Sequence, residues 1–155
     1  ALSRFESREL SSARMSDASL PYIATLTSLR SLGLRGTSIS DAAAEHLGKL
    51  VELKYLSLDS TKFTDAGVAK LGGLKHLTYL TLYATDVTDT SLSVFGGFKD
   101  LQYLNLVRTK ITEESAASLR DVLPECQIST SATPPKRGEN LPDGGGVFGG
   151  GFFGG

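Results

Sequence analysis

The sequence has little of several things that often reveal what a protein does. It has one cysteine, Cys126, so no disulfide can form within the chain, and cysteine usage leaves the redox compartment open. The formal net charge is −1, which does not favour nucleic acid or an acidic membrane surface as a partner. No apolar run approaches the length needed to span a bilayer. What remains is the size and composition of one globular domain, with 155 residues of which 40% are hydrophobic.

The beginning of the chain leaves the cellular location open. The first residue is Ala1 rather than methionine, as in a processed form or a fragment. We therefore keep two locations, the cytoplasm or, if an N-terminal signal has been removed, an exported protein.

Motifs that carry chemistry are equally scarce. Residues 144–154 satisfy G-x-G-x-x-G twice, but the chain then ends, without the helix and acidic residue that a dinucleotide site needs. There is no phosphate-binding G-x-x-x-x-G-K-[ST] and no G-x-S-x-G. His46 and His76 have no Cys or His cluster around them, so we expect surface histidines rather than metal ligands. The sequence predicts no enzyme, no cofactor and no metal site.

What the sequence has is an internal repeat of constant length. "LTYLTLYATDVTDTSL" at 77–92 matches "LRSLGLRGTSISDAAA" at 29–44, "LKYLSLDSTKFTDAGV" at 53–68 and "LQYLNLVRTKITEESA" at 101–116. The copies are evenly spaced, and the step from Leu53 to Leu77 is called the repeat length below. The shared frame is L-x-x-L-x-L-x-x-T-x-φ-[ST]-[DE], in which φ is an apolar residue and x is any residue. A weaker copy precedes these, with Arg8 where a leucine is expected and the other matching slots filled by Phe5, Leu10, Met15, Ser16, Asp17, Ile23 and Leu26.

Each copy predicts one strand followed by one short helical arc. Strand side chains alternate, so the leucines of a copy point to one side. A hydroxyl residue and then an acid indicate a helix start, where the acid faces the positive end of the helix dipole: Ser40–Asp41, Thr64–Asp65, Thr88–Asp89 and Thr112–Glu113. Apolar residues follow each start, ending with Ala116, Leu119 and Val122 in the last copy. One strand and one arc cannot bury this face alone, but stacked copies can.

The frame resembles the leucine-rich repeat family, in a form common in bacterial proteins that carry TxITDxGL after the strand. The resemblance covers roughly residues 5–130 and implies an α/β solenoid. That fold is a right-handed arc with a parallel sheet on the concave side and short helices on the convex side. The family usually has Asn or Cys where this chain has Thr37, Thr61, Thr85 and Thr109. We therefore expect hydroxyl hydrogen bonds to the local backbone in place of amide ones.

The ends of the repeat array should be capped. We assign residues 1–28 to a degenerate N-terminal capping repeat and residues 29–128 to the repeats with a C-terminal capping strand. "LPECQI" fits that strand if the last repeat is two residues shorter, with Leu123, Cys126 and Ile128 in the leucine slots and Gln127 at the fifth position. Cys126 is then a buried small hydrophobe, and a reactive or metal-binding cysteine is the less favoured alternative.

Residues 129–155 form a tail rich in Ser, Pro and Gly. Such a composition is typical of a disordered linker. Yet the tail also carries apolar side chains, which favour docking into a groove on a partner, on a neighbouring copy or on this domain: Val147, Phe148, Phe152 and Phe153. Both readings, a flexible tail and a docked one, stay open.

The concave side should present positions three, five and seven of the frame. The third position carries Tyr55, Tyr79 and Tyr103, which can form a ladder because parallel strands lie about 4.8 Å apart. The seventh position carries Arg35, Asp59 and Tyr83, and the fifth carries Asn105. Tyrosine is enriched at interface centres, but stacked tyrosines also stabilise neighbouring strands without any ligand. Tyr83, the one aromatic in its column, is the more pointed indication of a contact.

These residues predict a non-catalytic interaction module that binds a protein or peptide on its concave face. The predicted contacts are Tyr55, Tyr79, Tyr83, Tyr103, Arg35, Asp59 and Asn105. A glycan stacked on the tyrosines is a less favoured ligand. The alternative is a structural subunit that its Gly/Phe tail holds in a larger complex.

Overall fold

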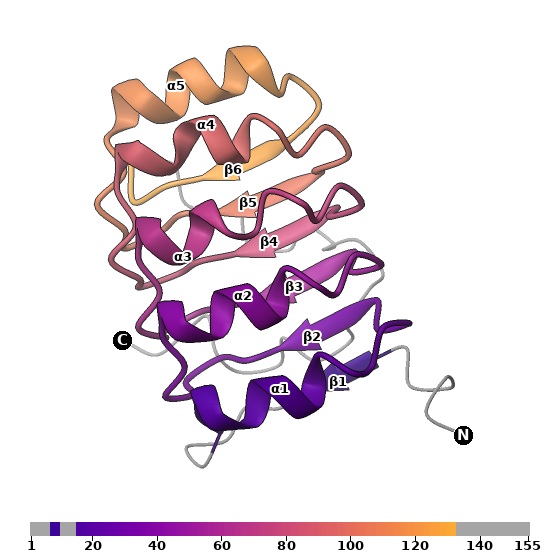
Figure 1. Ribbon diagram of the computed structural model, residues 1–155. Coiled ribbons are helices and arrows are strands. Elements are labelled where there is room, and N and C mark those ends of the chain that lie inside the picture. Colours follow the sequence, from indigo (N-terminus) through magenta and orange to yellow (C-terminus); the bar gives the residue numbers. More distant parts are fainter. Residues whose placement is uncertain (1–6, 10–14, 133–155) are drawn as a thin grey trace.

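The structure is a computed structural model that describes residues 7–9 and 15–132 (Figure 1). Its strands are β1 (Ser7–Glu9), β2 (Ser31–Gly33), β3 (Tyr55–Ser57), β4 (Tyr79–Thr81), β5 (Tyr103–Asn105) and β6 (Gln127–Ser129). Its helices are α1 (Leu20–Ile23), α2 (Ala44–Leu47), α3 (Asp65–Ala69), α4 (Leu92–Phe95) and α5 (Glu113–Val122). Short 3-10 turns at Asp17–Ser19, Asp41–Ala43 and Asp89–Ser91 lead into α1, α2 and α4. Among the described helices, none is long and apolar enough to cross a membrane.

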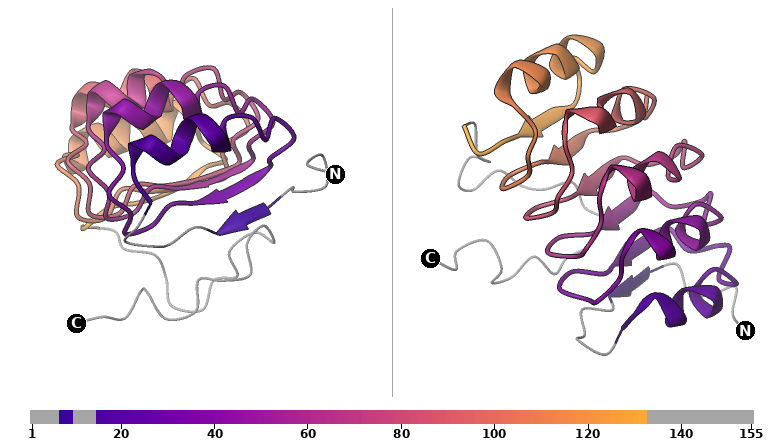
Figure 2. Two further views of the ribbon diagram at one scale, coloured as in Figure 1. Left: turned by 60° about the horizontal axis from the view of Figure 1, so that its bottom comes forward. Right: turned by 60° about the vertical axis from the view of Figure 1, so that its left-hand side comes forward.

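The strands form one parallel sheet in the order β1 to β6, with each strand beside the next in sequence. Every pair is offset by one repeat length, so Tyr55 lies opposite Tyr79, and Tyr79 opposite Tyr103. Figure 2 shows the helices as one layer on one face of this sheet and the curvature of the stack along its axis. The predicted solenoid, with strands on the concave side and short helices on the convex side, is confirmed.

Leucines of the frame make the core between sheet and helices. Leu77, Leu80 and Leu82 of one repeat are fully buried, and their counterparts in the other repeats join them in a single cluster. Burying each such side chain contributes about 1.5–3 kcal/mol, so the stack holds most of its stability in this seam. The sequence predicts Val122 in the core, but Val122 is 53% exposed, and Leu123 is buried instead. The reason is that α5 continues for 10 residues, which places Ala116, Leu119 and Leu123 on one helical face.

A threonine hydroxyl closes the turn after each of the strands β2 to β5, as the sequence predicts. The hydroxyls of Thr37, Thr61, Thr85 and Thr109 each donate to the leucine carbonyl three residues earlier, at 2.7 Å. The residue before each threonine has a left-handed backbone: Gly36 (φ 68°), Ser60 (55°), Ala84 (56°) and Arg108 (58°). A side chain in this conformation costs roughly 1–2 kcal/mol. Three of the four turns therefore bear strain that the hydroxyl bond and the flanking sheet hold in place.

The acid at each helix start reaches into the following repeat. The cap hydroxyls of Ser40, Thr64 and Thr88 accept from the backbone N–H two residues on, as expected. The carboxylates of Asp17, Asp41, Asp65 and Asp89 then accept from the backbone N–H of the next cap residue, 23 positions later, at 2.7–2.9 Å. Their second oxygen accepts from the hydroxyl of that same residue. These acids join one repeat to the next as well as facing a helix start.

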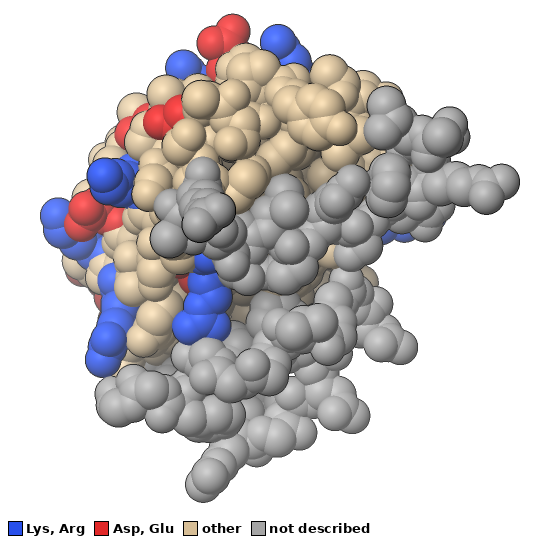
Figure 3. Space-filling view, turned by 90° about the horizontal axis from the view of Figure 1, so that it is seen from below, with Lys and Arg blue, Asp and Glu red and all other residues tan. Residues whose placement is uncertain are grey.

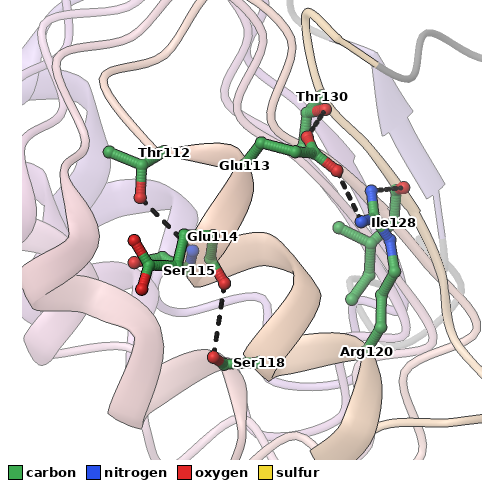
Figure 4. A network of polar contacts seen from close by, with 8 residues as sticks. All are labelled: Thr112, Glu113, Glu114, Ser115, Ser118, Arg120, Ile128 and Thr130. Atoms are coloured by element: carbon green, nitrogen blue, oxygen red, sulfur yellow. Dashed lines mark hydrogen bonds and ion pairs between the residues drawn. The ribbon is translucent and has the colours of Figure 1, made fainter.

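The last acid, Glu113, ties helix α5 to strand β6 instead (Figure 4). One carboxylate oxygen accepts from Arg120 Nη1 at 2.7 Å and the other from the Thr130 hydroxyl at 2.6 Å. Arg120 Nη2 donates to the Ile128 carbonyl at 3.3 Å. These hydrogen bonds hold the pKa of Glu113 below its usual value, the bond from Thr130 being the main cause. The end of the array is thus fixed by a local polar network.

The predicted position of the capping strand is wrong by two residues. Tyr103 pairs with Gln127 and Leu104 with Ile128, so the offset of one repeat length continues unchanged into β6. Gln127 therefore takes the third position rather than the fifth, and Ile128 the fourth. Cys126 is buried, as expected, but at the second position. The long α5 accounts for the difference, because its extra turn uses the residues that a shortened repeat would have lost.

Gly67 is required by the contact between two repeats, which leads to a stability prediction. A Cβ there would meet Asp41 Oδ1 and lie 2.8 Å from the Phe63 ring. In a helix interior, alanine is more favourable than glycine by about 1 kcal/mol. Overpacking costs about 1–3 kcal/mol, and the hydrogen bonds from Thr64 to the Asp41 carboxylate would be lost as well. We expect Gly67→Ala to lower the free energy of unfolding by roughly 2 kcal/mol in urea titrations.

The matched control is Gly73→Ala, because a Cβ at Gly73 meets no atom within 4 Å. We expect Gly73→Ala to leave stability unchanged or slightly higher. Equal loss in the two variants would show that the Asp41–Phe63 contact does not set the requirement for glycine.

The hydrogen bonds from each cap residue to the aspartate of the preceding repeat are called the aspartate joints below. They make the free energy of unfolding depend on pH in the acid range. Burial raises the pKa of Asp65, but hydrogen bonds from Ser91 and Thr88 outweigh it and leave the pKa below the ordinary 3.8. Stabilisation from a lowered pKa is complete above the unfolded value and disappears as the pH falls through the folded one. We expect Asp65→Asn to lose roughly 1–2 kcal/mol at neutral pH, by hydrogen-bond strength. The difference in unfolding free energy between Asp65→Asn and the unchanged chain should become smaller below pH 3.8 in unfolding titrations.

Asp86→Asn is the control for the aspartate joints. Asp86 forms an exposed ion pair with Lys110 at 3.3 Å, which contributes little to stability. A gap between Asp65→Asn and the unchanged chain that stays constant across this pH range would contradict the role of the Asp65 carboxylate.

Candidate partner-binding face

The concave face is the side of the sheet opposite the helices, formed by positions three, five and seven of each repeat. Its third-position residues are the first residues of their strands, so the parallel register sets them side by side. The stacked rings of Tyr55, Tyr79 and Tyr103 are called the tyrosine ladder below. The Tyr55 and Tyr79 ring centroids lie 4.8 Å apart, and those of Tyr79 and Tyr103 lie 4.7 Å apart. This spacing equals that of the strands themselves.

The tyrosine ladder is buried and separate from the leucine core. Tyr55, Tyr79 and Tyr103 are 5%, 3% and 2% exposed and form a cluster of their own. Stacked aromatic pairs contribute about 0.5–1.5 kcal/mol beyond the area they bury, so the ladder stabilises the sheet as well. Burial raises the pKa of Tyr79 well above its ordinary value, and its neighbours Tyr103 and Tyr55 add to the shift. Tyr79 in the middle of the ladder therefore stays neutral.

Two buried polar groups lie side by side next to the ladder. Thr81 and Asn105, at the fifth position of β4 and β5, are opposite each other in register and almost fully buried. Asn105 Oδ1 accepts from the Val107 N–H at 3.0 Å. Asn105 Nδ2 and the Thr81 hydroxyl, called the polar pair below, make no hydrogen bond within the part of the chain that is described. Each buried group left without a hydrogen bond costs about 1–3 kcal/mol.

The predicted seventh-position residues lie where the strands end. Asp59 is buried, and its carboxylate accepts from the Tyr83 backbone N–H at 2.8 Å. Tyr83 is half-buried, and the guanidinium of Arg108 lies 5.8 Å from its ring centroid, within the range of a cation–π contact. Arg35 is half-buried two repeats earlier in the same column. Tyr83 and Asp59 therefore have structural roles within the chain.

The structure brings some predicted residues together and leaves others apart. Tyr55, Tyr79, Tyr103 and Asn105 form one continuous patch, whereas Arg35, Asp59 and Tyr83 follow its edge. Thr81 joins the patch, and the exposed Gln127 extends the third-position column beyond Tyr103. The repeat length, continued without interruption, would have placed Gln127 there. The tail residues Val147, Phe148, Phe152 and Phe153 lie outside the described residues.

The histidines and charged residues of the described part do not form a metal site. His46 is half-buried on α2 and His76 is exposed. Within residues 7–9 and 15–132, no three His, Cys, Asp or Glu side chains gather as metal ligands would. Seen from below (Figure 3), Lys and Arg alternate with Asp and Glu along the left-hand margin. The charged surface in that view is therefore mixed in sign.

Comparison with known proteins gives the class of the fold. Residues 51–111 match the family described as Leucine rich repeat. A leucine-rich repeat protein of Leptospira interrogans has a similar structure, with a TM-score of 0.54 and 26% identity over 69% of this chain. Internalin C2 of Listeria monocytogenes matches with a TM-score of 0.52 and 20% identity over 75% of this chain. A search of curated proteins finds no significant match.

The described part of the chain has the leucine-rich repeat fold and is similar to a bacterial leucine-rich repeat protein. It spans 26% of the length of the Leptospira protein and 58% of that of the internalin. At 20% identity, the likeness to internalin C2 concerns the fold alone.

Burial makes the single thiol a structural group, which can be tested chemically. Cys126 is 7% exposed, and desolvation raises its pKa to about 12. The thiolate is the reactive form, so we expect an alkylating reagent to modify Cys126 at mildly basic pH only after denaturation. Mass spectrometry of folded and urea-treated protein measures this. Rapid alkylation of the folded chain at neutral pH would show a reactive cysteine instead.

Proposed function

We propose that the chain is a non-catalytic interaction module whose concave face binds an extended peptide segment of a partner protein. The observation that carries this proposal is the juxtaposition of the tyrosine ladder with the polar pair, Thr81 and Asn105. An open solenoid presents a long continuous surface of this kind, and tyrosines with nearby hydrogen-bonding groups are typical of interface centres. The leucine-rich repeat fold supports an interaction module in general terms.

The chemistry of the polar pair favours a peptide. Asn105 Nδ2 is a donor and the Thr81 hydroxyl can donate or accept, so a backbone carbonyl and a neighbouring amide would satisfy them. Apolar side chains of the same segment would lie along the edges of the tyrosine rings. A buried aromatic surface beside a few placed polar groups is the usual composition of a specific site.

The stacking geometry argues against a sugar ligand. Sugars bind aromatic residues through the ring faces, and here the facing surfaces of Tyr55, Tyr79 and Tyr103 are used on one another, with centroids 4.7–4.8 Å apart. No sugar ring fits between them. The alternative of a structural subunit held by its tail depends on residues outside the described part and stays a prediction.

Thr81→Val separates binding from folding. Valine matches the shape of threonine and removes the hydroxyl, so the free chain loses a buried group without a hydrogen bond and should be as stable or up to about 1 kcal/mol more stable. Binding should weaken by roughly 5–20-fold, because the bond to the partner is lost. The probe is a peptide selected from a random display library on the full chain, and calorimetric titration gives its Kd.

Two further variants complete this test. Tyr79→Ala should weaken binding of the same peptide at least as much, because a ring is lost from the ladder. Tyr22→Ala is the control, because Tyr22 is 64% exposed on α1 on the helical side. Full affinity in Thr81→Val and in a folded Tyr79→Ala would place the binding surface elsewhere. Loss of affinity in Tyr22→Ala would do the same.

A further inference from the structure

Strand β6 is the last strand of the sheet, so its outer side is a sheet edge. It pairs with β5 on one side, and among the described residues no strand lies beyond it. The Gln127 N–H donates to the Gln102 carbonyl at 2.8 Å. The Ser129 carbonyl accepts from the Leu106 N–H at 2.8 Å, so both of these β6 residues bond inward to β5. Because alternate residues of a strand direct their backbone groups to opposite sides, the N–H and carbonyl of Ile128 point outward at the edge.

A side-chain network from α5 lies along this edge (Figure 4). Arg120 Nη2 donates to the outward carbonyl of Ile128 at 3.3 Å. Arg120 Nη1 forms an ion pair with Glu113 at 2.7 Å, and the second Glu113 oxygen accepts from the Thr130 hydroxyl at 2.6 Å. The guanidinium is thus held between the strand carbonyl and a carboxylate that is itself bonded to the end of the strand. Arg120 and Glu113 are called the edge guard below.

We propose that the edge guard prevents the chain from pairing with a second copy of itself through β6. An open strand edge is a template for another strand, and proteins block such edges with charged side chains. Here the guanidinium occupies the acceptor that an added strand would use, and it places a charge where that strand would lie. This role is independent of the concave face and of its proposed ligand.

The edge of β6 is self-complementary, which favours a second copy as the occupant once the guard is removed. Ile128 presents one donor and one acceptor to the same side. If two β6 strands run antiparallel about a two-fold axis, the two Ile128 residues lie opposite each other and exchange two hydrogen bonds. Such a contact uses the same patch on both copies and therefore closes as a dimer. Since β6 has 3 residues, the contact is small and its formation depends on protein concentration.

Arg120→Met in the full chain tests the proposal. Methionine keeps a long unbranched side chain but removes the charge and the donors. We expect the folded variant to change from monomer to dimer between about 10 μM and 1 mM, a range that covers weak association. Sedimentation equilibrium measures the mass, and hydrogen exchange by NMR follows the Ile128 amide. That amide should exchange roughly tenfold more slowly at the higher concentration, when most of the variant is dimeric. In the unchanged chain, both the mass and the exchange rate should be the same at the two concentrations.

Lys70→Met is the matched control, because it also removes one positive charge, from an exposed residue at the end of α3. It should remain a monomer throughout. Glu113→Gln is a second variant, which removes the ion pair but leaves Arg120 in place, so it should dimerise at higher concentrations than Arg120→Met. If Arg120→Met does not fold, the same two measurements on Glu113→Gln decide.

A merely structural role of the network would lower stability without making either measurement depend on concentration. A folded Arg120→Met that stays monomeric at about 1 mM would therefore overturn the proposal. Equal dimerisation of the unchanged chain or of Lys70→Met would also overturn it. A dimer in which the Ile128 amide gains no protection would do the same, because the contact would then lie away from β6.

Discussion

The whole structure depends on an unbroken offset of one repeat length between neighbouring parallel strands. Because the sheet is parallel and in register, each residue meets the residue of the same frame position in the next repeat. A leucine column then becomes a core, a threonine column a row of turns and an aspartate column a row of joints. The energy of the stack is therefore a sum of like contacts between neighbours, with few contacts between distant repeats.

The same constraint explains how the tyrosines pack against one another. Their faces are used within the sheet, which fixes the rings rigidly at 4.7–4.8 Å. Tyr79 and Tyr103 lie on the same face of the sheet as Thr81 and Asn105, which follow them by two positions in the same strands. A surface of fixed rings loses little conformational entropy when a partner covers it. The proposed binding would therefore use a surface that packing within the sheet has already fixed.

Much of this could be predicted from the sequence, and the exceptions have physical reasons. The frame gives strands, arcs, caps and threonine turns, because each is a local pattern that recurs in every copy. It misplaces Gln127 and Val122, since the last repeat replaces a short arc with the 10-residue α5, which local spacing cannot reveal. It gives the aspartates a role only at their own helix start. It misses their hydrogen bonds to the next repeat, because these bonds depend on the register of the stacked repeats. It singles out Tyr83 as lacking a packing partner and misses Arg108, which meets the ring from the following turn. All of the predicted site residues remain predictions until binding is measured.

The aspartate joints also give the array a direction. In each joint the acid belongs to the earlier repeat and the cap hydroxyl with its N–H belongs to the later one, so every internal copy carries an acceptor end and a donor end. Glu113 closes the series by turning back to Thr130 within its own end. One whole copy of the repeat could therefore be gained or lost anywhere inside the series with both new joints intact. Such a protein can change the length of its concave face by duplication without inventing any new contact.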